Sequence, residues 1–170
     1  VYRDLELERH GVRYVYPEHL RGTIFPDQRS LVMYRDANRM ADEIARFSAR
    51  DARTFRQLVA DYGEFIDSTY LSLMYSPPLA PSLQSAQLEQ SAEGRTLLQW
   101  QASTPVQLLD ELFESEGVKV HFLARMTVLG FPPDQFGQGW ICLFRILKAE
   151  APICVGGSGS LALGLRRAVE

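Results

Sequence analysis

Four consecutive residues, Gly156, Gly157, Ser158 and Gly159, have the types and spacing that most directly suggest ligand binding. Glycines let a ligand approach the backbone closely, and the amino end of the helix expected over residues 161–169 attracts anions. The segment lacks the Gly-Lys-Ser/Thr ending of a P-loop and the downstream acidic residue of a dinucleotide-binding fingerprint. Two interpretations stay open: a contact with a ligand phosphate or ring, and a tight turn that starts a helix.

Three aromatic residues, Phe131, Phe136 and Trp140, lie in or beside an irregular stretch rich in Gly and Pro, residues 130–139. Aromatic walls are a common feature of pockets for apolar ligands, so these three are candidate substrate-binding residues. The alternative interpretation is that they belong to the hydrophobic core, where most aromatic residues of a soluble domain lie.

Paired carboxylates are the other pattern that could do chemistry, as general acids and bases. They occur at Asp110 with Glu111 and at Glu64 with Asp67, and both pairs lie opposite apolar stripes. Solvated helix faces are therefore the favoured interpretation. His121 stands inside an apolar segment, which is typical of a core histidine, and no Ser has a nucleophile-elbow context. The sequence therefore predicts no catalytic residue in this chain.

Metal binding is not predicted, because Cys142 and Cys154 form no C-x-x-C motif and His10, His19 and His121 are far apart. Both cysteines have apolar neighbours, which favours buried, reduced thiols. Reduced thiols are typical of a cytoplasmic protein, and this is the expected location.

The composition is that of an ordinary globular protein: 170 residues, 46% hydrophobic and 23% charged. The net charge of −3 and the scattered arginines argue against a nucleic-acid partner, which would require a basic face. The most apolar stretch, residues 118–129, is too short to cross a membrane and carries Lys119, His121 and Arg125.

The elements that must position these residues begin with strands. Residues 12–16 alternate apolar and polar side chains and are followed by Pro17. Residues 23–25 and 31–34 flank a turn-forming cluster, Pro26 to Gln28, which predicts a β-hairpin.

Helices follow the hairpin. Asp36 is predicted to cap a first helix, and Ser48 a long amphipathic one that continues to Tyr75. Further helices are expected over residues 83–101, from Pro105 onward, and over residues 118–129 and 140–148. These helices cover a small, mostly antiparallel sheet formed by the amino-terminal strands, so the expected fold class is α+β.

Three segments, in this order, resemble the phytoene desaturase-like FAD-dependent oxidoreductases, which include carotenoid desaturases, β-carotene ketolases and retinol saturase relatives. The first is the F-P-D-x-R-x-L hairpin that starts at Phe25 and continues to Y-R-D at residues 34–36. The second is the Gly-Pro loop at residues 129–134. The third is Pro152 followed by the glycine turn at residues 155–161.

The resemblance implies a division of the chain. Residues 1–150 would be a substrate-binding domain, and residues 151–170 a hinge and helix that return to an FAD-binding domain. The family's amino-terminal G-x-G-x-x-G fingerprint is absent, so we expect an internal fragment that is inactive alone. In the parent enzyme, the Gly156–Gly159 turn would lie near the FAD, and the substrate would be apolar, of isoprenoid or carotenoid type.

Other interpretations remain beside this one. The chain could be a non-catalytic interaction module that docks a partner through its long amphipathic helix. The substrate could instead be an amine or another small molecule. An isoprenoid substrate would also suit peripheral contact with a membrane, although no basic amphipathic helix supports this. Apolar surface left without its flavin domain could make the fragment a homodimer.

Overall fold

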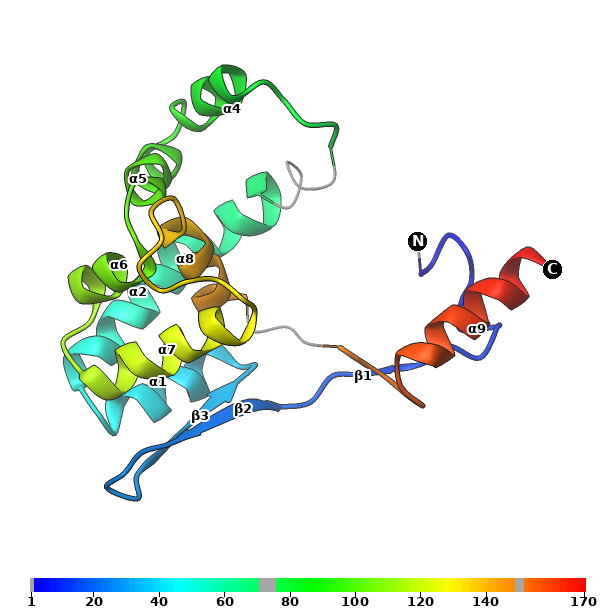
Figure 1. Cartoon of the computed structure of the whole chain (residues 1–170), viewed down its shortest axis with the longest axis horizontal. Coiled ribbons are helices and arrows are strands. Elements are labelled where there is room, and N and C mark those ends of the chain that lie inside the picture. The colour runs from blue at the N-terminus through cyan, green and yellow to red at the C-terminus, as the bar shows by residue number, and fades with distance from the viewer. Residues whose placement is uncertain (1, 71–75, 149–151) are drawn as a thin grey trace.

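The computed structural model describes residues 2–70, 76–148 and 152–170, and within them the chain is an α+β protein. The predicted fold class is therefore confirmed. Most of the chain forms a helical body with a β-hairpin along one side, and the two ends meet in a small terminal unit at some distance from it (Figure 1). We use "helical body" for residues 19–70 with 76–147 and "terminal unit" for residues 2–15 with 152–170.

The predicted hairpin is present as β2 (His19–Ile24) and β3 (Ser30–Tyr34), paired antiparallel. Its turn follows from local chemistry, since Asp27 Oδ1 accepts the backbone N–H of Arg29 at 3.1 Å and Oδ2 pairs with the Arg29 Nε at 2.7 Å. Gln28 takes a left-handed φ of 67° at the tip.

The strand predicted at residues 12–16 shrinks to β1 (Tyr14–Val15), and its partner is not the hairpin. It pairs antiparallel with β4 (Ile153–Cys154), so the sheet is divided into two separate two-stranded ladders. Alternation of side chains indicates that a strand exists, but it does not specify a partner about 140 residues away along the chain. The prediction of one sheet formed by the amino-terminal strands was therefore wrong, although the predicted fold class is correct.

Two predicted helix starts are confirmed. The Asp36 side chain accepts the N–H of Arg39 at 2.9 Å and begins α1 (Ala37–Ala45). Ser48 accepts the N–H of Asp51 at 3.1 Å and begins α2 (Ala49–Phe65). The long helix is not regular throughout its predicted length, because a π-helical turn, η1 (Ile66–Tyr70), follows α2. The remainder of the prediction, residues 71–75, lies outside the described residues.

The helix expected over residues 83–101 is two helices, α4 (Pro81–Leu88) and α5 (Ala92–Gln101). Ser91 starts the second one by accepting the N–H of Gly94 at 2.9 Å. A Cβ at position 94 would lie 2.0 Å from the Leu88 carbonyl oxygen, so only glycine allows the two helices to approach this closely.

The remaining helices are α6 (Pro105–Leu112), α7 (Glu116–Val128), α8 (Gly139–Leu147) and α9 (Ser158–Val169). The predicted start at Pro105 is confirmed and is reinforced by a complete capping box between Thr104 and Gln107, at 3.0 and 3.1 Å. The irregular stretch between α7 and α8 is also as predicted, with left-handed φ values of 82° and 84° at Gly130 and Gly137.

One hydrophobic core joins β3 to α1, α2, α5, α6, α7 and α8. Its centre is a group of aromatic rings, with Phe122 of α7 lying 5.4 Å from Phe113 and 6.4 Å from Phe55, centroid to centroid. Phe55 and Leu58 place the apolar stripe of α2 inside this core. That stripe is therefore used within the fold.

Candidate functional site

The glycine turn lies between β4 and α9 in the terminal unit. Gly156 and Gly157 have φ values of 82° and 84°, which a side chain rarely tolerates, and a Cβ on Gly156 would lie 2.5 Å from Ser160 Oγ. α9 begins at Ser158, three residues earlier than expected, without a side-chain cap. All four residues, Gly156 to Gly159, are exposed. The turn does start a helix, and a ligand contact there remains a prediction.

The two ends of the chain hold this turn in place. Besides the β1–β4 ladder, the Tyr2 hydroxyl donates to the Val12 carbonyl at 2.8 Å, and Arg167 Nη1 donates to the His10 carbonyl at 3.2 Å. Gly164 of α9 lies so close to Val12 that a Cβ there would be 2.0 Å from Val12 Cγ2. Residues 2–15 and 152–170 therefore form one packed unit (Figure 1).

The family-like Y-R-D segment lies where the linker from β1 reaches the helical body. The Arg35 guanidinium lies 4.8 Å from the centre of the Tyr16 ring, and the Arg35 N–H donates to the Glu18 carbonyl at 3.1 Å. Together with Asp36 these residues line an open hollow of about 420 Å³. The segment fastens the linker to the hairpin while Asp36 caps α1.

The three candidate aromatic residues lie in different surroundings. Phe131 and Trp140 are partly buried and pack against the core. Phe136 is 68% exposed and stands on the loop between α7 and α8. The structure therefore brings two of the three to the core and leaves one at the surface. Their role in binding a substrate remains a prediction.

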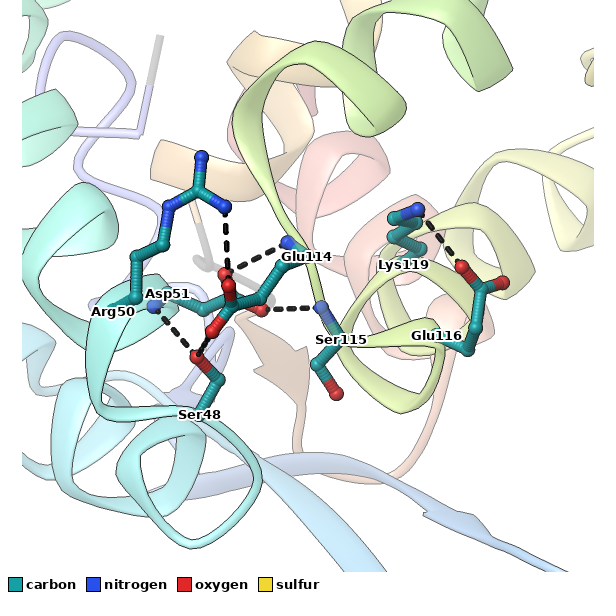
Figure 2. A network of polar contacts seen from close by, with 7 residues as sticks. All are labelled: Ser48, Arg50, Asp51, Glu114, Ser115, Glu116 and Lys119. Atoms are coloured by element: carbon teal, nitrogen blue, oxygen red, sulfur yellow. Dashed lines mark hydrogen bonds and ion pairs between the residues drawn. The ribbon is translucent and has the colours of Figure 1, made fainter.

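Asp51, in the first turn of α2, has partners that the sequence did not indicate. It is fully buried, and its two carboxylate oxygens accept the backbone N–H groups of Glu114 and Ser115, each at 2.9 Å. Around it, Ser48 Oγ donates to Glu114 Oε1 at 2.6 Å, and Arg50 pairs with Glu114 Oε2 at 3.0 Å (Figure 2). These bonds with Ser48 and Arg50 hold the pKa of Glu114 below its usual value. Because both oxygens of Asp51 are occupied, its function is structural.

His121 is buried, as the sequence favoured. Its Nδ1 lies 2.8 Å from Thr23 Oγ1, which links α7 to the hairpin, and its Nε2 is buried without a partner among the described residues. Burial, and then the charges of Arg125 and Arg21, lower the pKa of His121 to about 4. The imidazole is therefore neutral near pH 7, and it would be a poor general acid there.

Arg125 occupies the next turn of α7, and the sequence indicated only that its charge disfavours a membrane span. Its Nη1 donates to Met33 Sδ at 2.9 Å and its Nη2 to the Lys148 carbonyl at 2.8 Å. Burial, followed by the charges of Arg145 and Arg21, lowers the pKa of Arg125 to about 10.

The carboxylate pairs lie on exposed faces, as predicted. Asp110 pairs with Lys119 at 2.8 Å, and Asp67 pairs with Lys148. The Cys142 thiol is buried, which raises its pKa to about 12, and Cys154 is half-buried.

Neither a metal centre nor a membrane span is found in the part of the chain that the structure describes. No group of three or more His, Cys, Asp or Glu residues there could hold a metal ion. No helix among residues 2–70, 76–148 and 152–170 has the length and apolar character needed to span a bilayer.

Comparison with known proteins gives an informative similarity. No protein-family profile matches the chain. The chain is 24% identical over 169 residues to a limonene dehydrogenase subunit of Castellaniella defragrans. The match covers 98% of this chain, so it includes the hairpin, the helical body and the terminal unit, but only 31% of that protein. The chain thus spans less than a third of the length of this curated relative.

Proposed function

We propose that this chain is the substrate-binding part of an FAD-dependent dehydrogenase that acts on an isoprenoid or similarly apolar molecule. The observation that carries the proposal is the similarity to a limonene dehydrogenase subunit over 98% of the chain. Limonene is an apolar isoprenoid hydrocarbon, and the three family-like segments point independently to flavin oxidoreductases of isoprenoids. An amine substrate has no comparable support.

The pairing of β1 with β4 supports an inserted domain. The β1–β4 ladder of the terminal unit places the strand from which the chain leaves toward the helical body beside the strand that follows its return. Such a pair of adjacent connections is typical of a domain inserted into another, and it allows the two domains to move as units. We infer that residues 2–15 belong with residues 152–170, on the side of the FAD-binding domain, rather than with the substrate-binding domain.

The glycine turn is suited to the cofactor. Gly157 has open space where a side chain would be, and Gly156 to Gly159 leave the amino end of α9 exposed. Such a backbone can approach an anionic group closely, and the helix amino end favours its charge. The flavin would supply the redox chemistry by accepting electrons from the substrate, while this chain orients the substrate and excludes water from it.

Phe136, with Phe131 and Trp140 beside it on the same loop and the following helix, is proposed to contact the apolar substrate. A surface aromatic side chain that is 68% exposed is a natural contact for a hydrocarbon. The name of the relative suggests that the enzyme contains a second protein. That protein would have to contact a surface other than the apolar stripe of α2, because Phe55 and Leu58 of that stripe are buried in the core. We propose a cytoplasmic location with peripheral access to membrane-dissolved substrate.

The test is reduction of the bound flavin by substrate. The polypeptide that carries this chain is purified, and limonene is added without oxygen while the flavin absorbance is followed. We expect bleaching, and we expect Phe136→Ala to need several-fold more limonene for the same rate. Leu83→Ala, another exposed apolar side chain, at 60% exposure on α4, is the control. A flavin that no isoprenoid hydrocarbon reduces would refute the proposed substrate class.

A further inference from the structure

Three arginines lie on the hairpin, α7 and α8, in the region where α7 contacts β3. In the β2–β3 ladder Arg21 is paired with Met33, and Thr23 with Leu31. Directly paired residues of an antiparallel ladder lie on the same face. Met33 and Leu31 are buried, so this face is turned toward the core, and the bond between Thr23 and His121 shows that α7 covers it.

α7 carries the second arginine, Arg125, to this face, and α8 carries the third, Arg145, whose charge acts on Arg125. Arg125 lies four residues after His121, hence on the same face of α7, and donates to Met33 Sδ, the ladder neighbour of Arg21. Its second bond goes to the Lys148 carbonyl, directly after α8. Arg145 stands three residues before Lys148, one turn back on α8.

The guanidinium groups of this arginine cluster (Arg21, Arg125 and Arg145) have no carboxylate partner among the described residues. The two hydrogen bonds that Arg125 donates within the described residues go to a thioether and a carbonyl. Arg145 lies 5.5 Å from the centre of the Phe144 ring, and its buried Nε has no hydrogen-bond partner in the described part of the chain. The carboxylate of Asp67 is paired with Lys148 and not with an arginine of the cluster.

In this respect the three clustered arginines differ from several others in the molecule. Five other arginines of the helical body are paired with acids. These pairs are Arg29–Asp27, Arg39–Glu18, Arg46–Glu43, Arg50–Glu114 and Arg56–Asp42. The exposed arginines of these pairs are thus neutralised, whereas the three clustered ones are not. Arg125 and Arg145 are half-buried, and removing their charges from water without an acid partner is costly; like charges add repulsion.

We propose that Arg21, Arg125 and Arg145 bind an oxyanion, the carboxylate or phosphate group of a ligand. The planar guanidinium presents parallel N–H donors that match both groups. Arg21 is exposed, so an anion can reach the cluster from solvent. Arg125 and Arg145 are half-buried, so less water competes for their N–H donors and their bonds to the anion would be stronger. An apolar isoprenoid offers no such group, so this site is separate from the proposed hydrocarbon site.

The test is thermal unfolding of the 170-residue chain in sodium phosphate or sodium acetate, against sodium chloride at equal ionic strength. We expect at least one oxyanion to raise the Tm saturably. We expect Arg21→Met to weaken the apparent affinity about tenfold or more, because Met keeps the apolar stem and removes the charge. Arg53→Met, another exposed arginine, on α2, is the control and should bind as the unaltered chain does.

Response to phosphate alone assigns a phosphate site, response to acetate alone a carboxylate site, and response to both a general oxyanion site. A second measurement separates a binding role from a structural one. Without added oxyanion, Arg145→Met should leave the Tm unchanged or raise it, because repulsion within the cluster falls. No saturable effect of either anion, or an effect that Arg21→Met and Arg145→Met both leave intact, would overturn the proposal.

Discussion

Asp51 Oδ2 accepts a hydrogen bond from the backbone N–H of Ser115 at 2.9 Å, although 64 residues separate the two along the chain. The other carboxylate oxygen accepts the N–H of Glu114, also at 2.9 Å. One buried side chain in the first turn of α2 therefore satisfies two donors at the start of α7 (Figure 2). This bond pair fixes the connection between α6 and α7 against α2.

Replacing Asp51 with Ala should lower the free energy of unfolding by about 2 to 4 kcal/mol, because two N–H groups lose charged acceptors in a place that water does not reach. Urea unfolding followed by circular dichroism measures the change. Asp134→Ala, at an exposed loop position, is the control and should change stability by less than about 0.5 kcal/mol. Equal effects of the two substitutions would contradict the structural role of Asp51.

The buried His121 makes stability depend on pH. Its pKa is about 4 in the folded chain, below the ordinary value of 6.5, so the unfolded chain takes up the proton first as the pH falls. The stabilisation is complete above about pH 6.5 and is lost progressively toward pH 4, by up to about 3 kcal/mol. Urea unfolding at pH 7.5 and at pH 5.5 measures the first part of this loss, above the range in which Asp and Glu titrate.

His121→Leu is the matching variant, because it removes the titrating group and keeps an apolar side chain in the core. It should be less stable at pH 7.5, since the contact with Thr23 is lost. Its stability should nevertheless change less than that of the unaltered chain between pH 7.5 and pH 5.5. The same pH dependence in both proteins would show that another group is responsible.

Gly63 lies within α2 in open space, with no atom within 4 Å of the position of an added Cβ. Gly63→Ala should therefore stabilise the chain by about 0.5 to 1 kcal/mol, because alanine restricts the unfolded chain and favours the helix. Thermal unfolding should show a higher Tm. A lower Tm would mean that the regular helix at this position, just before η1, depends on glycine for another reason.

Gly164 is the opposite case, because α9 packs on Val12 at this point. A Cβ there would lie 2.0 Å from Val12 Cγ2, so Gly164→Ala should force α9 away from the amino-terminal segment. We expect faster hydrogen exchange in residues 12–15 and 153–155, with the helical body unchanged. Unaltered exchange in both strands would contradict the close packing of the terminal unit.

The sequence predicted well the features that depend on neighbouring residues. The helix starts at Asp36, Ser48 and Pro105 and the hairpin turn around Asp27 all follow from side chains that bond the backbone within three residues. The break at Ser91 was missed although it is local, because a polar, weakly patterned segment gave no clear apolar face on either side of it.

Contacts between distant segments were out of reach. The β1–β4 ladder, the bond from Asp51 to Ser115 and the arginine cluster each join residues that no sequence periodicity connects. The candidate site shows the same division. The position of the Gly156–Gly157 turn could be predicted from residue types, whereas the exposure of Phe136 and the burial of Trp140 depend on how α8 packs.

The central claim is that this chain serves a flavin-dependent dehydrogenase. The most direct test is the visible absorption spectrum of the purified polypeptide that carries the chain, recorded before and after incubation with FAD and removal of the excess. The account predicts flavin bands at about one FAD per polypeptide. A protein that is colourless after purification, and that remains colourless after incubation with FAD, would contradict it.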